Sequence, residues 1–218
     1  MNRAERPFEF FTASYITRID NERAQNLGEL RAGLAHCRDA SIFYHTFQAL
    51  GRYHFLTEGF SNDLAQWVLA SLNRPRLAEQ LGSIDVRSYV DLTGLRQDLV
   101  RTIDEFLRAY PTAADVEAFE PFYFCSSAEV LVALGWEAWT LAEFRHYLER
   151  MGHGSFHFHF LVSRLRLQLH SNDFSVWFKD ALGLEHLARL TERIDITTDT
   201  IDGAKAHLLR LIDRELAA

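Results

Sequence analysis

The feature that most constrains the fold of this chain is an internal repeat of its own sequence. When the 218 residues are shifted by 114 positions, residues of the first half meet identical residues in the second half. Nine first-half residues that do so are Phe8, Phe10, Leu27, Glu29, Arg31, Leu34, Ser41, His45 and Arg52. After a gap of four residues the shift becomes 110, and Asn62-Asp63-x-x-x-Trp67 recurs as Asn172-Asp173-x-x-x-Trp177. These matches in one register indicate a tandem duplication.

The repeat predicts the domain organisation and most of the secondary structure. We place one helical repeat at residues 8–107, a linker at 108–121 and a second helical repeat at 122–216. Within each repeat, apolar residues recur mostly at helical spacing, and Asn26, Thr140, Asn62 and Asn172 stand where helix N-caps are expected. The alternating phenylalanines that open each repeat are ambiguous, since they suggest a short strand followed by an extended segment or a helical turn. The sequence thus predicts a mainly α fold of two homologous multi-helix repeats, packed with pseudo-two-fold symmetry.

Composition limits the classes of function. The chain has 23 Lys and Arg residues against 30 Asp and Glu residues, and its net charge of -7 argues against an extended nucleic-acid-binding surface. No apolar run approaches the ~20 residues of a membrane helix, and no signal peptide is recognisable, so we expect no membrane partner and a cytoplasmic location. Cys37 and Cys125 occupy non-matching positions and have no metal-ligand spacing, which predicts reduced thiols.

Several phrases carry a resemblance to a known family. The first half reads SIFYHTF, SNDLAQWVLASL and LAEQLGSID, and the second half reads SFHFHFL, SNDFSVWFKDAL and LARLTERID. They resemble an uncharacterised prokaryotic family, the domain of unknown function numbered fifty-seven fifty-two. The resemblance covers nearly the whole chain, and the Asn-Asp-x-x-x-Trp phrase is its most specific part. It implies a family and no activity, so no site residues are carried over.

One polar stripe stands out on the second helix of each repeat. Ser41, His45 and Arg52 are spaced by four and seven residues, which places them within roughly 40° of one helix face. Ser155, His159 and Arg166 repeat the stripe. Polar groups on an otherwise apolar helix require hydrogen-bond partners, so the stripe needs a physical cause.

Two interpretations compete for this stripe. In the structural one, His45 and Arg52 bond to the Asn62-Asp63 cap or to Asp85 and hold neighbouring helices together.

In the functional interpretation, the two stripes converge on a cleft between the repeats. His45 and His159 with Asp63 and Asp173 would be catalytic, because imidazole and carboxylate suit proton transfer or metal binding. Ser41, Arg52, Ser155 and Arg166 would be ligand-binding residues. The chain has no HExxH, CxxC or nucleophile-elbow motif, so this constellation matches no known motif.

Two further residue groups have alternative interpretations. His157 and His159 lie in a histidine-rich tract and are candidate metal ligands, although His157 replaces Phe43 of the first repeat, which favours a partly buried histidine. Trp67 and Trp177 each lie four residues after a helix cap and are predicted to be core anchors rather than platforms on which a ligand stacks.

The sequence specifies no reaction. The first hypothesis is a non-catalytic binding or regulatory module whose partner is a protein or a small-molecule ligand, with a homo-oligomer as a compatible state and no cofactor. The alternative is a metal-dependent or acid-base hydrolase that uses the paired His and Asp residues between the repeats.

Overall fold

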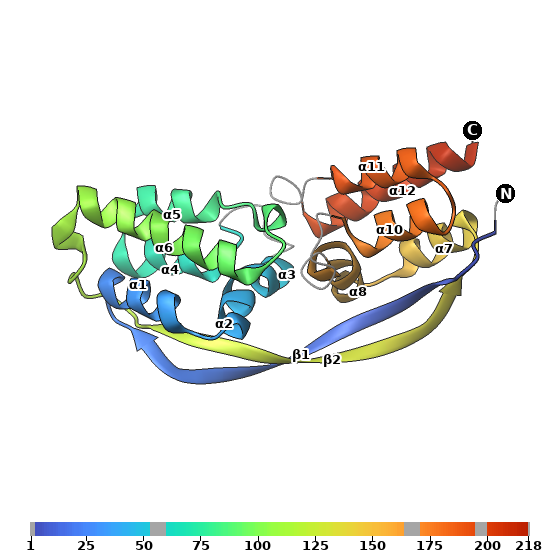
Figure 1. Ribbon diagram of the computed structural model, residues 1–218. Coiled ribbons are helices and arrows are strands. Elements are labelled where there is room, and N and C mark those ends of the chain that lie inside the picture. The colour runs from blue at the N-terminus through green and yellow to red at the C-terminus, as the bar shows by residue number, and fades with distance from the viewer. Residues whose placement is uncertain (1–2, 53–59, 164–170, 195–199, 218) are drawn as a thin grey trace. The chain divides into compact units, whose positions relative to one another are not determined.

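Two long β-strands are the main difference between the structure and the sequence prediction. The computed structural model of the protein describes residues 3–52, 60–163, 171–194 and 200–217. Strands β1 (Phe8–Ala24) and β2 (Phe122–Ala138) form a two-stranded antiparallel sheet (Figure 1). The structure is 61% helical and 17% strand, so the prediction of a mainly α fold with pseudo-two-fold packing of helical repeats was wrong, and the fold is mixed α/β.

The length of the strands escaped prediction because only their ends alternate. At the start of β1, Phe8 and Phe10 are buried and Glu9 is exposed; Phe122, Tyr123 and Phe124 repeat this pattern in β2. In the middle of each strand, consecutive residues are exposed on both faces. A ribbon with solvent on both faces has no period-two hydrophobic pattern to detect.

The chain divides into two compact units, and both strands contribute to each unit. Unit 1 comprises Met1–Ser14 and Glu129–Ala218, and unit 2 comprises Tyr15–Ala128. The strand segment that opens the first predicted repeat therefore lies with helices of the second, and the segment that opens the second lies with helices of the first. The repeat boundaries 8–107 and 122–216 describe the sequence and stay a prediction.

Unit 2 contains the helices between the two strands in sequence. In chain order these are α1 (Leu27–His36), α2 (Asp39–Phe43), the π-helix η1 (Tyr44–Gln48), α3 (Ala49–Arg52), α4 (Asp63–Leu72), α5 (Pro75–Gly82), the 3₁₀ helix η2 (Val86–Ser88), α6 (Leu92–Ala109) and the 3₁₀ helix η3 (Pro111–Ala113).

Unit 1 contains the helices that follow β2. In chain order these are α7 (Leu141–Arg150), α8 (His153–His157), the π-helix η4 (Phe158–Val162), α10 (Asp173–Asp180), α11 (Glu185–Glu192) and α12 (Ile201–Ala217). None of the described helices of the chain is long and apolar enough to cross a membrane.

The predicted N-caps are confirmed in both units. The side chain of Asn26 accepts a hydrogen bond from the third residue of α1, and Asn62 does the same for α4. Thr140 and Asn172 cap α7 and α10, and each forms a reciprocal capping box. The caps satisfy backbone N–H groups that the first helical turn leaves without partners.

The predicted core tryptophans are also confirmed. Trp67 is 8% exposed and Trp177 is 7% exposed. The indole N–H of Trp67 donates to the carbonyl of Glu120 at 2.7 Å, and that of Trp177 donates to the carbonyl of Arg6 at 2.9 Å. Each tryptophan thereby ties a helix to the backbone just before a strand.

A glycine on α1 makes room for a strand side chain. A Cβ atom added to Gly33 would lie 2.4 Å from Cζ of Phe124, a ring that is almost fully buried. Replacing a helical glycine with alanine normally stabilises a protein by about 0.5–1 kcal/mol, but overpacking a core costs about 1–3 kcal/mol. We therefore expect Gly33→Ala to lower the free energy of unfolding by about 1–2 kcal/mol in urea denaturation.

Gly94→Ala on α6 is the matched control for this substitution. Its added Cβ would lie 3.5 Å from the nearest atom, a ring carbon of Tyr89, which is ordinary van der Waals contact. We expect Gly94→Ala to leave the free energy of unfolding unchanged or to raise it. Equal stabilisation by both substitutions would show that Phe124 does not constrain α1.

Candidate functional site

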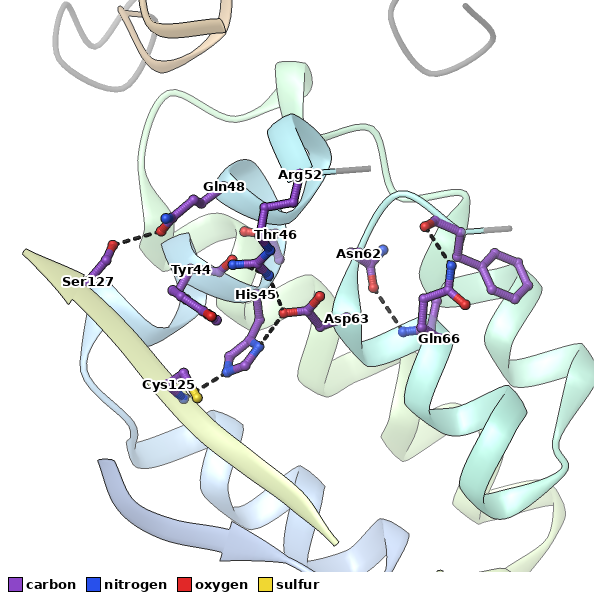
Figure 2. A network of polar contacts seen from close by, with 12 residues as sticks. Tyr44, His45, Thr46, Gln48, Arg52, Asn62, Asp63, Gln66, Cys125 and Ser127 are labelled. Carbon is purple, nitrogen blue, oxygen red and sulfur yellow. Dashed lines mark hydrogen bonds and ion pairs between the residues drawn. The ribbon is translucent and has the colours of Figure 1, made fainter. Parts of the chain in front are cut away.

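His45 lies at the second position of the π-helix η1 and bonds through both ring nitrogens (Figure 2). Its Nδ1 is 2.7 Å from Oδ2 of Asp63, and its Nε2 is 2.9 Å from the backbone nitrogen of Cys125 on β2. The imidazole is buried and joins the start of α4 to a strand. A π-helix in the middle of a helix is rare and often marks a residue with a special role.

The bonds of His45 fix the positions of its protons. A backbone N–H can only donate, so Nε2 must accept the bond from Cys125. In the neutral ring the proton then sits on Nδ1, which donates to the Asp63 carboxylate. Both nitrogens are occupied within the protein, so His45 in this state has no ring nitrogen to offer to a substrate or a metal ion.

Arg52 completes the cluster around Asp63. Its Nη2 lies 2.6 Å from Oδ2 of Asp63, and its guanidinium stacks over the ring of Tyr44 at 4.2 Å. His45 and Arg52 thus both bond to Asp63, as the structural interpretation predicted. Asp85, the other partner considered, pairs with Arg87 at 2.8 Å.

His159 makes the corresponding bonds in unit 1. Its Nδ1 is 2.8 Å from Oδ2 of Asp173, and its Nε2 is 2.9 Å from the backbone nitrogen of Phe11 on β1. The hydroxyl of Ser155 donates to the carbonyl of Phe11 at 2.5 Å. His159 and Ser155 therefore bond to the N–H and the C=O of the same strand residue. Because Nε2 of His159 accepts from a backbone N–H, the proton of the neutral ring sits on Nδ1, as in His45.

Three predicted site residues remain to be placed, namely Ser41, His157 and Arg166. Ser41 is buried on α2 and lies beside the Cys37 thiol. His157 is buried on α8, as its replacement of Phe43 suggested. Arg166 lies outside the described residues. In the part of the chain that the structure describes, no three His, Cys, Asp or Glu side chains are grouped so that they could hold a metal ion.

Cys125 is beside His45 without forming a catalytic pair with it. The bond to His45 comes from the backbone nitrogen of Cys125. Burial raises the pKa of the Cys125 thiol, and the charges of Asp20 and Asp63 raise it further. Burial likewise raises the pKa of the Cys37 thiol. A raised pKa keeps a thiol protonated and poorly nucleophilic, so neither cysteine is prepared for nucleophilic chemistry.

The His159 cluster forms one wall of a pocket in unit 1. The pocket has a volume of about 580 Å³, which is within the usual range for small-molecule sites. Its aromatic wall consists of Phe8, Phe11 and Trp177. The charged groups around it are Glu5, Arg6, Glu9, Asp173 and Asp180.

Sequence reasoning identified only part of this pocket. His159 and Asp173 were candidates, but Glu5, Glu9 and Asp180 were not. Glu5 precedes β1 and Glu9 lies on it, far in sequence from α10, and exposed acidic residues are too common to signal a site. The long-range pairing of the first strand with the last helices was needed to find them.

Comparison with known proteins places the chain in a family. No curated protein sequence matches it. The solved structure of OrfY from Thermoproteus tenax is similar, with 29% sequence identity and a TM-score of 0.86 over 100% of this chain and 99% of that one. A family model, described as a family of unknown function (DUF5752), matches residues 5–213. Because this match covers nearly the whole sequence, the chain belongs to the DUF5752 family.

Proposed function

We propose that this chain is a non-catalytic binding or regulatory protein of the cytoplasm that takes a positively charged small molecule in the unit 1 pocket. The observation that carries the proposal is the pocket of about 580 Å³, whose lining includes four acidic residues, Glu5, Glu9, Asp173 and Asp180, and one described basic residue, Arg6. An excess of carboxylates in a concave site concentrates cations. The aromatic wall adds favourable contacts for an ammonium or guanidinium group.

The bonding of the histidines supports binding over catalysis. A general base needs a free nitrogen within reach of the substrate, and a metal ligand needs a free lone pair. His159 uses Nε2 to accept from Phe11 and Nδ1 to donate to Asp173. The alternative hydrolase would require the strand bond at Phe11 to break before His159 could react.

Titration with organic cations tests the proposal. We expect spermidine or arginine to bind the purified chain in calorimetry, with an affinity that falls as salt is added. The double variant Glu9→Gln, Asp180→Asn removes two exposed charges. Each should contribute about 0.5–0.7 kcal/mol to the binding free energy, so the affinity should fall about fivefold to tenfold. Glu117→Gln, an exposed acid that does not line the pocket, is the matched control and should bind like the unmodified chain.

Two outcomes would reject this function. If neither cation binds, or if the double variant binds as well as the control, the pocket is not a cation site. If instead Mn²⁺ or Zn²⁺ raises the melting temperature and His159→Gln abolishes the effect, the metal-dependent hydrolase becomes the better hypothesis.

We also propose that the chain arose by tandem duplication in a prokaryotic family. The identities at one shift support the duplication. So do the paired bonds of His45 and His159, each to an aspartate and to a strand N–H.

A further inference from the structure

The middle of β2 exposes an apolar segment without interruption. Val130 is 47% exposed, Leu131 is 49% exposed and Val132 is 47% exposed. From Val130 to Trp136 the sequence VLVALGW contains no charged residue and no proline. Exposed strands usually carry such residues, because an uncharged strand edge readily pairs with another chain.

The edge of β2 in this segment is open for pairing. The described residues form a sheet of only two strands, so each strand has a strand neighbour on one side only. In unit 1, the free side of β1 is held by His159 and Ser155, which bond to the backbone of Phe11. The outer edge of the unit 1 ribbon is therefore the edge of β2.

The three residues Val130-Leu131-Val132 are symmetric about Leu131. If two copies pair antiparallel with the two-fold axis at Leu131, Leu131 lies opposite itself and Val130 lies opposite Val132 of the other copy. Apolar side chains then meet apolar side chains on both faces. Glu129 lies opposite Ala133 of the other copy, so the two Glu129 carboxylates are not brought face to face.

We propose that two copies of this chain associate through residues 129–133 of β2, paired antiparallel about Leu131. The occupant of the exposed edge is thus a second copy of the same segment, and the interface is isologous. This inference is independent of the cation pocket, because none of the residues 129–133 lines it.

Disulfide cross-linking tests the register of this pairing. Residues directly opposite in an antiparallel pair have Cα atoms about 4.5–5.5 Å apart, which suits a disulfide, whereas diagonal neighbours are about 7–8 Å apart. Under mild oxidation, Leu131→Cys should give a covalent dimer of the full chain. Val130→Cys, an equally exposed neighbour, should give at least fivefold less, and the unmodified chain with Cys37 and Cys125 sets the background.

Light scattering after size exclusion tests the association itself. We expect twice the monomer mass for the unmodified chain at ~100 μM and the monomer mass for Leu131→Lys, which would oppose two ammonium groups at the axis. Ile19→Lys, at an exposed apolar residue of β1, should remain dimeric. A monomeric unmodified chain, a dimeric Leu131→Lys, or equal cross-linking at positions 130 and 131 would each overturn the proposal.

Discussion

Replacing His159 with alanine is expected to lower the free energy of unfolding by about 3–5 kcal/mol. The substitution removes a buried ring whose centroid lies 5.0 Å from that of Phe8 and 5.8 Å from that of Phe174. It also removes the hydrogen bond to Asp173 and the acceptor of the Phe11 N–H, and a buried N–H left without its acceptor costs about 1–3 kcal/mol. At roughly 2–4 °C per kcal/mol, the melting temperature should fall by about 6 °C or more.

His153→Ala is the matched control, because it removes a histidine–aspartate pair at the surface. His153 bonds to Asp202 at 2.5 Å, but its side chain is 45% exposed. Exposed ion pairs contribute about 0–1 kcal/mol, so we expect a change within that range. Denaturant unfolding followed by circular dichroism measures both variants. If His159→Ala lowers the free energy of unfolding no more than His153→Ala does, the buried His159–Asp173 pair does not hold β1 in unit 1.

Phe124→Ala is expected to have the second large effect, in unit 2. Phe124 is 1% exposed and lies between the Phe122 ring and helix α1, where its Cζ fills the space left by Gly33. Truncating a buried phenylalanine costs about 3–5 kcal/mol through lost apolar burial and the cavity that remains.

Tyr123→Ala provides the comparison on the same strand. Tyr123 is adjacent in sequence, points to the opposite face and is 50% exposed. We expect it to change the free energy of unfolding by less than about 1 kcal/mol. Comparable losses at positions 123 and 124 in urea titrations would mean that the strand end has no distinct buried face.

The helices could be predicted because their signals are local. Caps such as Asn62 and Thr140 and the apolar spacing around Trp67 lie within a few residues of the structure they specify. The extent of the strands could not be predicted, because the pairing partner of β1 lies about a hundred residues away and the middle of the ribbon has no buried face. Strand pairing depends on contacts that a single segment does not encode.

In the candidate site, too, local features could be predicted and long-range contacts could not. The stripe of Ser155 and His159 was visible at helical spacing, and the bond from His45 to the Asp63 cap was among the structural expectations. The hydrogen bond that each histidine accepts at Nε2 could not be predicted, because its donor is a backbone N–H. Every residue except proline has such a group, so the sequence does not mark which one is the partner. The acids Glu5 and Glu9 join Asp173 only through the fold.

The discontinuity of unit 1 imposes an order on its assembly during synthesis. The strand segment around Phe11 is made well before Ser155, His159 and α10, which hold it in place, whereas unit 2 is built from one continuous stretch, Tyr15–Ala128. At translation rates of roughly 5–20 residues per second, the segment waits on the order of 10–30 s for those partners. During that interval Phe8 and Phe10 have no helices of their own unit to cover them, so completing unit 1 depends on keeping an apolar strand available until the second half of the chain has been made.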